Sequence, residues 1–167
     1  MKRTVLLAAL AAAIPSLAQS PTAGFVFRAQ LSGYQEVPAV ATTGSGSLDL
    51  MLSGDAQAVE YELSYSRLQG TVQQAHIHFA QPGVSGSIVV WLCGTATNPG
   101  PAGTPTCPQS GTVTGVFTAA NVVAAASSQQ LGTGELAKLI QALRASAAYV
   151  NVHTTLSPGG EIRGQIF

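Results

Sequence analysis

The sequence is short of charge. Only 8% of its 167 residues are Asp, Glu, Lys or Arg, and seven basic residues balance seven acidic ones. A nucleic-acid partner requires clustered Lys and Arg, so we expect none. A disordered chain is also excluded, because 46% of the residues are hydrophobic and the net charge is zero. The surface must take its polarity from Ser, Thr, Asn, Gln and Gly.

Long apolar runs are missing after the N-terminal segment. No stretch there reaches the about 18 consecutive apolar residues of a membrane span, so we expect none. The N-terminal segment has two basic residues, a short apolar run at residues 5–14, and the small-x-small sequence Ser16-Leu17-Ala18. We therefore expect a signal peptide over residues 1–18, cleaved after Ala18. Residues 19–167 then form one exported domain, in the periplasm or outside the cell.

Cysteine is limited to Cys93 and Cys107. Export into an oxidising compartment predicts a disulfide between them. The bond would close a segment rich in Gly, Pro and Thr, and the chain-entropy model gives it roughly 3 kcal/mol. The alternative is a cysteine ligand for a metal. The loop around Cys107 holds no histidine, and this favours the disulfide.

Catalytic motifs are also lacking. The chain has no zinc-finger spacing, no His-Glu-x-x-His helix and no Gly-x-Ser-x-Gly elbow. Asp49 and Asp55 flank a turn, where solvated carboxylates are the simplest interpretation. We predict no reaction, and the residues favour a role without catalysis over an enzyme.

Alternating apolar and polar residues predict short β-strands. The clearest is residues 59–65, with Val59, Tyr61, Leu63 and Tyr65 on the apolar face. The others are expected at residues 25–31, with Phe25 facing inward, and at 47–52, 75–79, 88–92, 112–117, 149–154 and 161–167. Strands of this length with turns between them argue for an all-β sandwich or a Greek-key barrel.

One helix is predicted. Leu136, Leu139, Ile140 and Leu143 form an amphipathic stripe at helical spacing. Thr133 can cap this helix. Residues 121–126 are a further candidate for a short helical turn.

The three histidines, His76, His78 and His153, all lie on expected strands, each at a position opposite in parity to an apolar neighbour. Residues two apart in a strand point to the same face, so His76 and His78 project together. If their strand lies beside that of His153, three imidazoles converge. Three nitrogen ligands with an open fourth position suit copper first and zinc second. The alternative is a network of structural hydrogen bonds in a non-catalytic binding or structural module without metal.

Five segments together resemble the CHRD domain, the module named for its repeats in chordin. They are residues 31–38, 75–78, 82–83, 149–154 and 158–165. The resemblance covers about residues 25–167 and implies an immunoglobulin-like β-sandwich or barrel, with a limited likeness to copper–zinc superoxide dismutases. It implies no established activity. Chordin is an extracellular growth-factor antagonist, but its cysteine-rich repeats have no counterpart here.

Four other residues have structural roles that the sequence predicts. Glu161 and Arg163 lie two apart and are expected to form an ion pair that ties the last strand to a loop. Glu36 is expected to cap loop backbone, with a histidine-orienting role as the alternative. Trp91, beside a cysteine in an apolar strand, is expected in the core.

Overall fold

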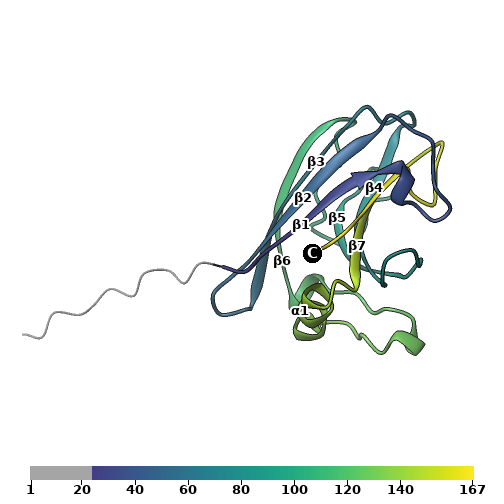
Figure 1. Cartoon of the computed structure of the whole chain (residues 1–167). Coiled ribbons are helices and arrows are strands. Elements are labelled where there is room, and N and C mark those ends of the chain that lie inside the picture. Colours follow the sequence, from purple (N-terminus) through teal and green to yellow (C-terminus); the bar gives the residue numbers. More distant parts are fainter. Residues whose placement is uncertain (1–23) are drawn as a thin grey trace, which may run out of the picture.

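The computed structural model describes residues 24–167, which form a mostly antiparallel β fold with one helix (Figure 1). The strands are β1 (Val26–Ser32), β2 (Ser45–Leu52), β3 (Ala58–Ser66), β4 (Val72–Phe79), β5 (Ser87–Cys93), β6 (Gly111–Thr118), β7 (Ala148–Thr154) and β8 (Ile162–Gln165). The predicted all-β class is therefore confirmed. The expected signal peptide and its cleavage site lie outside the described residues.

All eight strands belong to one sheet, in the order β5-β4-β7-β8-β1-β2-β3-β6, and every pair of neighbours is antiparallel. The sheet curls until β5 approaches β6, which makes a nearly closed barrel (Figure 1). Strand β6 returns to β3 past the β4–β5 hairpin, and such a return is typical of Greek-key topology. This order also places β4 directly beside β7, although about 70 residues of chain separate them.

The helix α1 (Leu136–Arg144) covers one end of the barrel (Figure 1). Its predicted stripe is buried in the core. Glu135 stands at the N-cap position, and no side chain caps the helix, so the expected cap by Thr133 is wrong. Helical turns occupy Ala119–Asn121 and Ser127–Gln129, whereas most of the expected turn at residues 121–126 is not helical.

The barrel interior is apolar and follows strand parity. In β3, Val59, Tyr61, Leu63 and Tyr65 are all buried, as predicted. In β1, Phe27 is buried, but Phe25, which precedes the strand, is 58% exposed. The expected inward position of Phe25 is therefore wrong.

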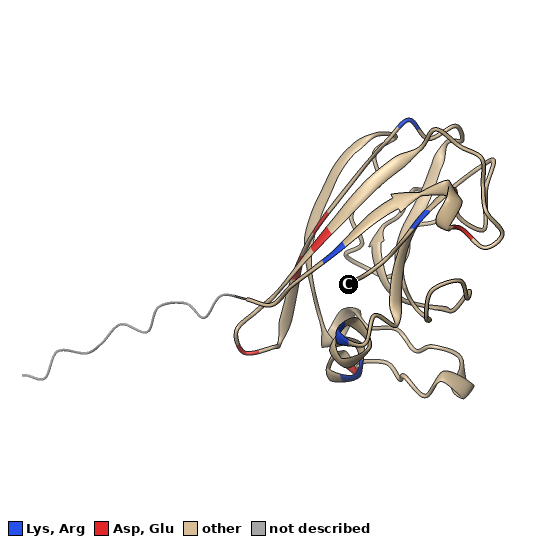
Figure 2. Cartoon of the chain, in the orientation of Figure 1, with Lys and Arg blue, Asp and Glu red and all other residues tan. Residues whose placement is uncertain are grey.

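The disulfide between Cys93 and Cys107 is present and joins the end of β5 to the loop before β6. Charged side chains are thinly spread over the ribbon (Figure 2). The two ion pairs between side chains in residues 24–167 are Arg28–Asp49 and Lys138–Glu135, both exposed. The helical segments of this described part are all too short or too polar to cross a membrane.

Strand β7 is buried at all seven of its positions, as is the shorter β8 at its four. Its inward residues Ala148, Val150 and Val152 belong to the apolar core. Its outward residues Tyr149, Asn151 and His153 are buried as well. The outer face of β7 is therefore covered by chain, and this cover creates a second, polar interior outside the barrel wall.

Candidate metal centre

The three histidines meet in this polar interior. His76 and His78 point outward from β4, and His153 points outward from the neighbouring β7. The register pairs Gln74 with His153 and His76 with Asn151, so the imidazoles lie on adjacent strands of one face. All three are buried, with exposures of 0%, 7% and 6% in sequence order.

The imidazoles converge on one small region. One ring nitrogen from each residue can be chosen so that all three atoms lie within 4.8 Å of one another. Nδ1 of His76 lies 3.1 Å from Nε2 of His153. The ring centres of His76 and His78 are 5.5 Å apart. The convergence that strand parity predicts is therefore present in the fold.

Backbone carbonyls fix two of the tautomers. Nδ1 of His78 lies 3.0 Å from the carbonyl oxygen of Gly86, and Nδ1 of His153 lies 2.9 Å from that of Pro158. A carbonyl oxygen only accepts, so each Nδ1 carries the proton. Each Nε2 is then left with a lone pair that faces the cluster. This outward hydrogen bond from the second nitrogen is the arrangement by which proteins orient histidine ligands.

Acceptors outnumber protons inside the cluster. Nε2 of His76 and Nε2 of His78 are buried and have no hydrogen-bond partner among residues 24–167. Each neutral imidazole carries one proton, and those of His78 and His153 are donated to carbonyls outside the cluster. Only the proton of His76 remains for the ring nitrogens that face one another. A site rich in lone pairs and poor in protons fits a cation, so these residues pass the chemical test for a transition metal.

Burial keeps the imidazoles neutral. It lowers the pKa of His76 far below 6.5, and the neighbouring His153 and His78 lower it further. Burial also lowers the pKa of His78 to about 4, although its hydrogen bond to Gly86 raises it. Burial lowers the pKa of His153 too, against a raising effect from the Pro158 carbonyl. Neutral imidazole is the form that binds metal.

Three loops cover the cluster, and side chains of the polar face hold them. The loop between β4 and β5 is held by His78, by the Tyr149 hydroxyl, which accepts from the Gly86 amide at 3.3 Å, and by Arg163, which donates to the Val84 carbonyl at 2.9 Å. The loop between β7 and β8 is held by the bond from His153 to Pro158. The loop after β1 carries Glu36.

Arg163, Tyr149 and His78 form a stack across three strands. The Tyr149 ring lies parallel to the His78 ring at 4.7 Å, and the Arg163 guanidinium lies 3.4 Å from the Tyr149 ring centre. Because β7 lies between β4 and β8, the two partners contact opposite faces of the tyrosine. The stacking contact with Tyr149 restricts the orientation of the His78 ring.

Glu36 lies at the margin of the cluster, 7% exposed, and its Oε1 has no hydrogen-bond partner among the described residues. Burial raises the pKa of Glu36 to about 7, although the charge of Arg163 and the amide of Asn151 act to lower it. The backbone-capping role expected from the sequence contributes only one hydrogen bond, at Val37. Glu36 thus lies beside Asn151, within the region of the site.

Glu161 and Arg163 do not pair, so the expected ion pair is wrong. Glu161 precedes β8, and its carboxylate accepts from Thr42, Thr154 and the amides of Gln69 and Gly70, at 2.6 to 3.1 Å. Burial raises the pKa of Glu161, but these hydrogen bonds outweigh it and hold the pKa below its usual value. This buried carboxylate joins three loops.

Two residues of the site were misjudged or missed by sequence reasoning. Trp91 was expected in the core but is only partly buried, and it pairs in register with His76 on the polar face. Asn151, 2% exposed, has its Oδ1 2.9 Å from Nε2 of His153. A signal for Asn151 was available, because it lies two residues from His153 and so shares its parity.

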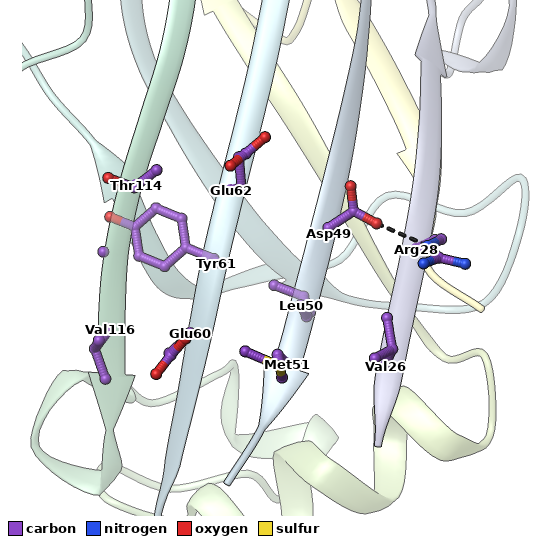
Figure 3. A pocket seen from close by; sticks show the side chains of 11 residues that line it. Val26, Arg28, Asp49, Leu50, Met51, Glu60, Tyr61, Glu62, Thr114 and Val116 are labelled. Atoms are coloured by element: carbon purple, nitrogen blue, oxygen red, sulfur yellow. Dashed lines mark hydrogen bonds and ion pairs between the residues drawn. The ribbon is translucent and has the colours of Figure 1, made fainter. Parts of the chain in front are cut away.

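A groove of about 580 Å³ lies elsewhere. It crosses the outer faces of β1, β2, β3 and β6 (Figure 3). Its lining includes Met51, Val116 and the exposed Arg28–Asp49 pair, but no histidine. Without a buried polar group aimed into it, this groove offers no chemistry comparable to that of the histidine cluster.

Comparison with known proteins agrees with the motifs. A family model described as CHRD domain matches residues 27–166. No curated protein and no solved structure matches the chain. Since the match spans most of the chain, the protein belongs to the CHRD domain family.

Proposed function

We propose that this CHRD-domain protein binds one transition-metal ion, copper before zinc, through His76, His78 and His153. The observation that supports this most strongly is the set of three ligand nitrogens within 4.8 Å of one another in a buried site. The protons of His78 and His153 are committed to carbonyls outside the cluster, which leaves lone pairs for the ion.

The ligand chemistry favours copper(II). Imidazole suits both copper and zinc, and for nitrogen ligands the affinity for copper(II) exceeds that for zinc. The cysteines contribute no thiolate, because both are in the disulfide. A bound ion would supply a fixed positive charge where the lone pairs converge. The role that we propose is binding, with no reaction assigned.

We also propose that the protein is exported. The disulfide is typical of an oxidising compartment. The N-terminal sequence has the pattern of a signal peptide over residues 1–18, which leaves residues 19–167 as the mature CHRD domain in the periplasm or outside the cell.

A second candidate function is a non-catalytic binding or structural module without metal. The bonds from His78 to Gly86 and from His153 to Pro158 support it, because they hold two covering loops to the sheet. In that case the histidines would serve only packing and hydrogen bonding, and their loss would reduce stability without affecting any ion.

Metal titration separates the two candidates. The protein is purified without an affinity tag, treated with chelator, and titrated with copper(II) or zinc against a competing chelator. We expect one equivalent to bind, with copper tighter. Replacing any of the three histidines by Ala should weaken binding by at least about 100-fold, beyond the 10–100-fold typical of outer-shell changes. Asp49→Ala, at an exposed position, is the matched control. Equal affinity in all four variants would overturn the proposal.

A further inference from the structure

The inward oxygen of Asn151 completes the ring of acceptors around the cluster. Asn151 lies on β7 opposite His76 in the register and two residues before His153, so its side chain shares their face. It is 2% exposed. Its Oδ1 is 2.9 Å from Nε2 of His153.

The orientation of the amide follows from its second contact. Nδ2 of Asn151 lies 3.4 Å from the carbonyl oxygen of Gly159, which can only accept. The NH₂ group therefore points to the loop and Oδ1 points to the histidines. A flipped amide would set two carbonyl oxygens against each other at Gly159.

Two lone pairs consequently face each other. Nε2 of His153 carries no proton, because its Nδ1 proton is donated to Pro158. At 2.9 Å, this nitrogen and Oδ1 of Asn151 repel one another. A second proton on His153 would remove the repulsion, but charging an imidazole at 6% exposure carries a large desolvation cost. A cation bound by both atoms removes the repulsion without that cost.

The spacing fits shared ligands. Two atoms that each lie 2.0–2.1 Å from one ion are about 2.9 Å apart at a right angle and about 3.4 Å apart at the tetrahedral angle. The pair His153 Nε2 and Asn151 Oδ1 is separated by 2.9 Å, and the pair His153 Nε2 and His76 Nδ1 by 3.1 Å. Both values fall in or at the edge of that range.

We propose that Asn151 is the fourth ligand of the metal, through Oδ1, so that the centre is a three-nitrogen, one-oxygen site closed by protein atoms. This inference rests on the proposed function, and it replaces the open fourth position expected from the histidines alone. A carboxamide oxygen is a hard ligand, which favours copper(II) and zinc over copper(I). A closed ligand set suits storage or a structural role of the ion better than turnover of a substrate.

The test uses two variants at this position. Asn151→Leu has a similar size and no donor atom, whereas Asn151→Asp keeps an oxygen and adds a negative charge. We expect Asn151→Leu to weaken copper(II) binding by more than about 100-fold, beyond the 10–100-fold typical of outer-shell changes. We expect the chelator-treated Asn151→Leu protein to be no less stable than wild type, because the repulsion is gone. Asn151→Asp should keep tight binding and shift the copper(II) electron paramagnetic resonance spectrum.

The outcomes distinguish the two proposals. If wild type binds no metal, the proposed function fails and this inference fails with it. If wild type binds but Asn151→Leu matches its affinity and spectrum, the histidine site stands and Asn151 is no ligand. If Asn151→Leu does not fold, Asn151→Asp decides alone, since a copper(II) spectrum identical to wild type would exclude direct coordination.

Discussion

His76 and Trp91 meet edge to face, with 4.2 Å between their ring centres and 76° between their planes. They are cross-strand partners of β4 and β5, and Trp91 is the single tryptophan of the chain. Its indole emission, which can be excited selectively, thus comes from one residue in direct contact with a proposed metal ligand.

Copper(II) should therefore quench the Trp91 emission. An open-shell ion within a few ångströms of an indole quenches it efficiently, whereas closed-shell zinc does not. We expect a decrease that saturates at one equivalent of copper, and little change with zinc. The His78→Ala variant keeps Trp91 and should lose the saturable phase. Quenching that rises linearly without saturation in wild type would point to collisional encounters and count against the site.

The metal-free protein should lose stability in mild acid. The unfolded chain takes up protons near pH 6.5 at each histidine, whereas burial lowers the pKa of all three in the fold. Their contribution is thus complete above about pH 6.5 and falls as the pH drops toward the folded values. Each imidazole changes the free energy of unfolding by about 1.4 kcal/mol per pH unit.

Glu36 partly offsets this loss, because its folded pKa of about 7 exceeds the unfolded value of 4.5 and acid favours its folded form. The net slope between pH 6.5 and 5 keeps the sign of the histidines, because His76 and His78 outweigh Glu36, and we expect it to be on the order of 1 kcal/mol per pH unit or more. Urea unfolding with chelator at several pH values measures it. A flat profile across this window would show that the histidines titrate normally.

Replacing Glu36 by Gln should stabilise the metal-free protein in base. The raised pKa means that the ionised carboxylate is disfavoured in the fold, so its stabilising contribution is present below pH 4.5 and lost as the pH rises through about 7. The neutral amide escapes that loss. We expect Glu36→Gln to exceed wild type by about 1–3 kcal/mol at pH 8 and to match it near pH 4.5. A variant that is less stable than wild type at pH 8 would contradict the raised pKa.

Loss of the Glu161 carboxylate should be costly. Glu161→Ala removes the acceptor of the part-buried amide of Gln69 and of the buried amide of Gly70, and also the acceptor of the Thr42 and Thr154 hydroxyls. Each unsatisfied buried group costs about 1–3 kcal/mol, so we expect a total of about 3 kcal/mol or more. Thermal or urea unfolding measures the change. Asp49→Ala, which breaks an exposed ion pair, is the control and should cost at most about 1 kcal/mol. Similar losses in both variants would refute the role of Glu161.

Most of the predicted histidine site follows from strand parity. It fixed the shared face of His76 and His78, and with the adjacency of β4 and β7 it brought His153 to them. Parity does not give the burial or the partner of a residue at the end of a strand. Phe25 precedes β1 and is exposed, and Glu161 precedes β8 and bonds to loops instead of Arg163.

The positions of the loops over the histidines could not be predicted from strand parity. The loops that bury the histidines are not periodic, and their positions depend on single long-range contacts such as that from Arg163 to Val84. Trp91 was misplaced for a related reason. An apolar run such as residues 88–92 does not reveal which of its two faces meets a polar layer, and the register with β4 decides it.

The burial of β7 on both faces has a consequence for how the sequence can vary. In β3, outward Glu60 and Glu62 are exposed, so random substitution should be tolerated at every second position. In β7 no position faces solvent. A saturation library sorted for folded protein should therefore be depleted at all seven sites, with apolar replacements surviving at one parity and hydrogen-bonding ones at the other. The strand that carries His153 should therefore tolerate fewer substitutions than β3, whether or not an ion is bound.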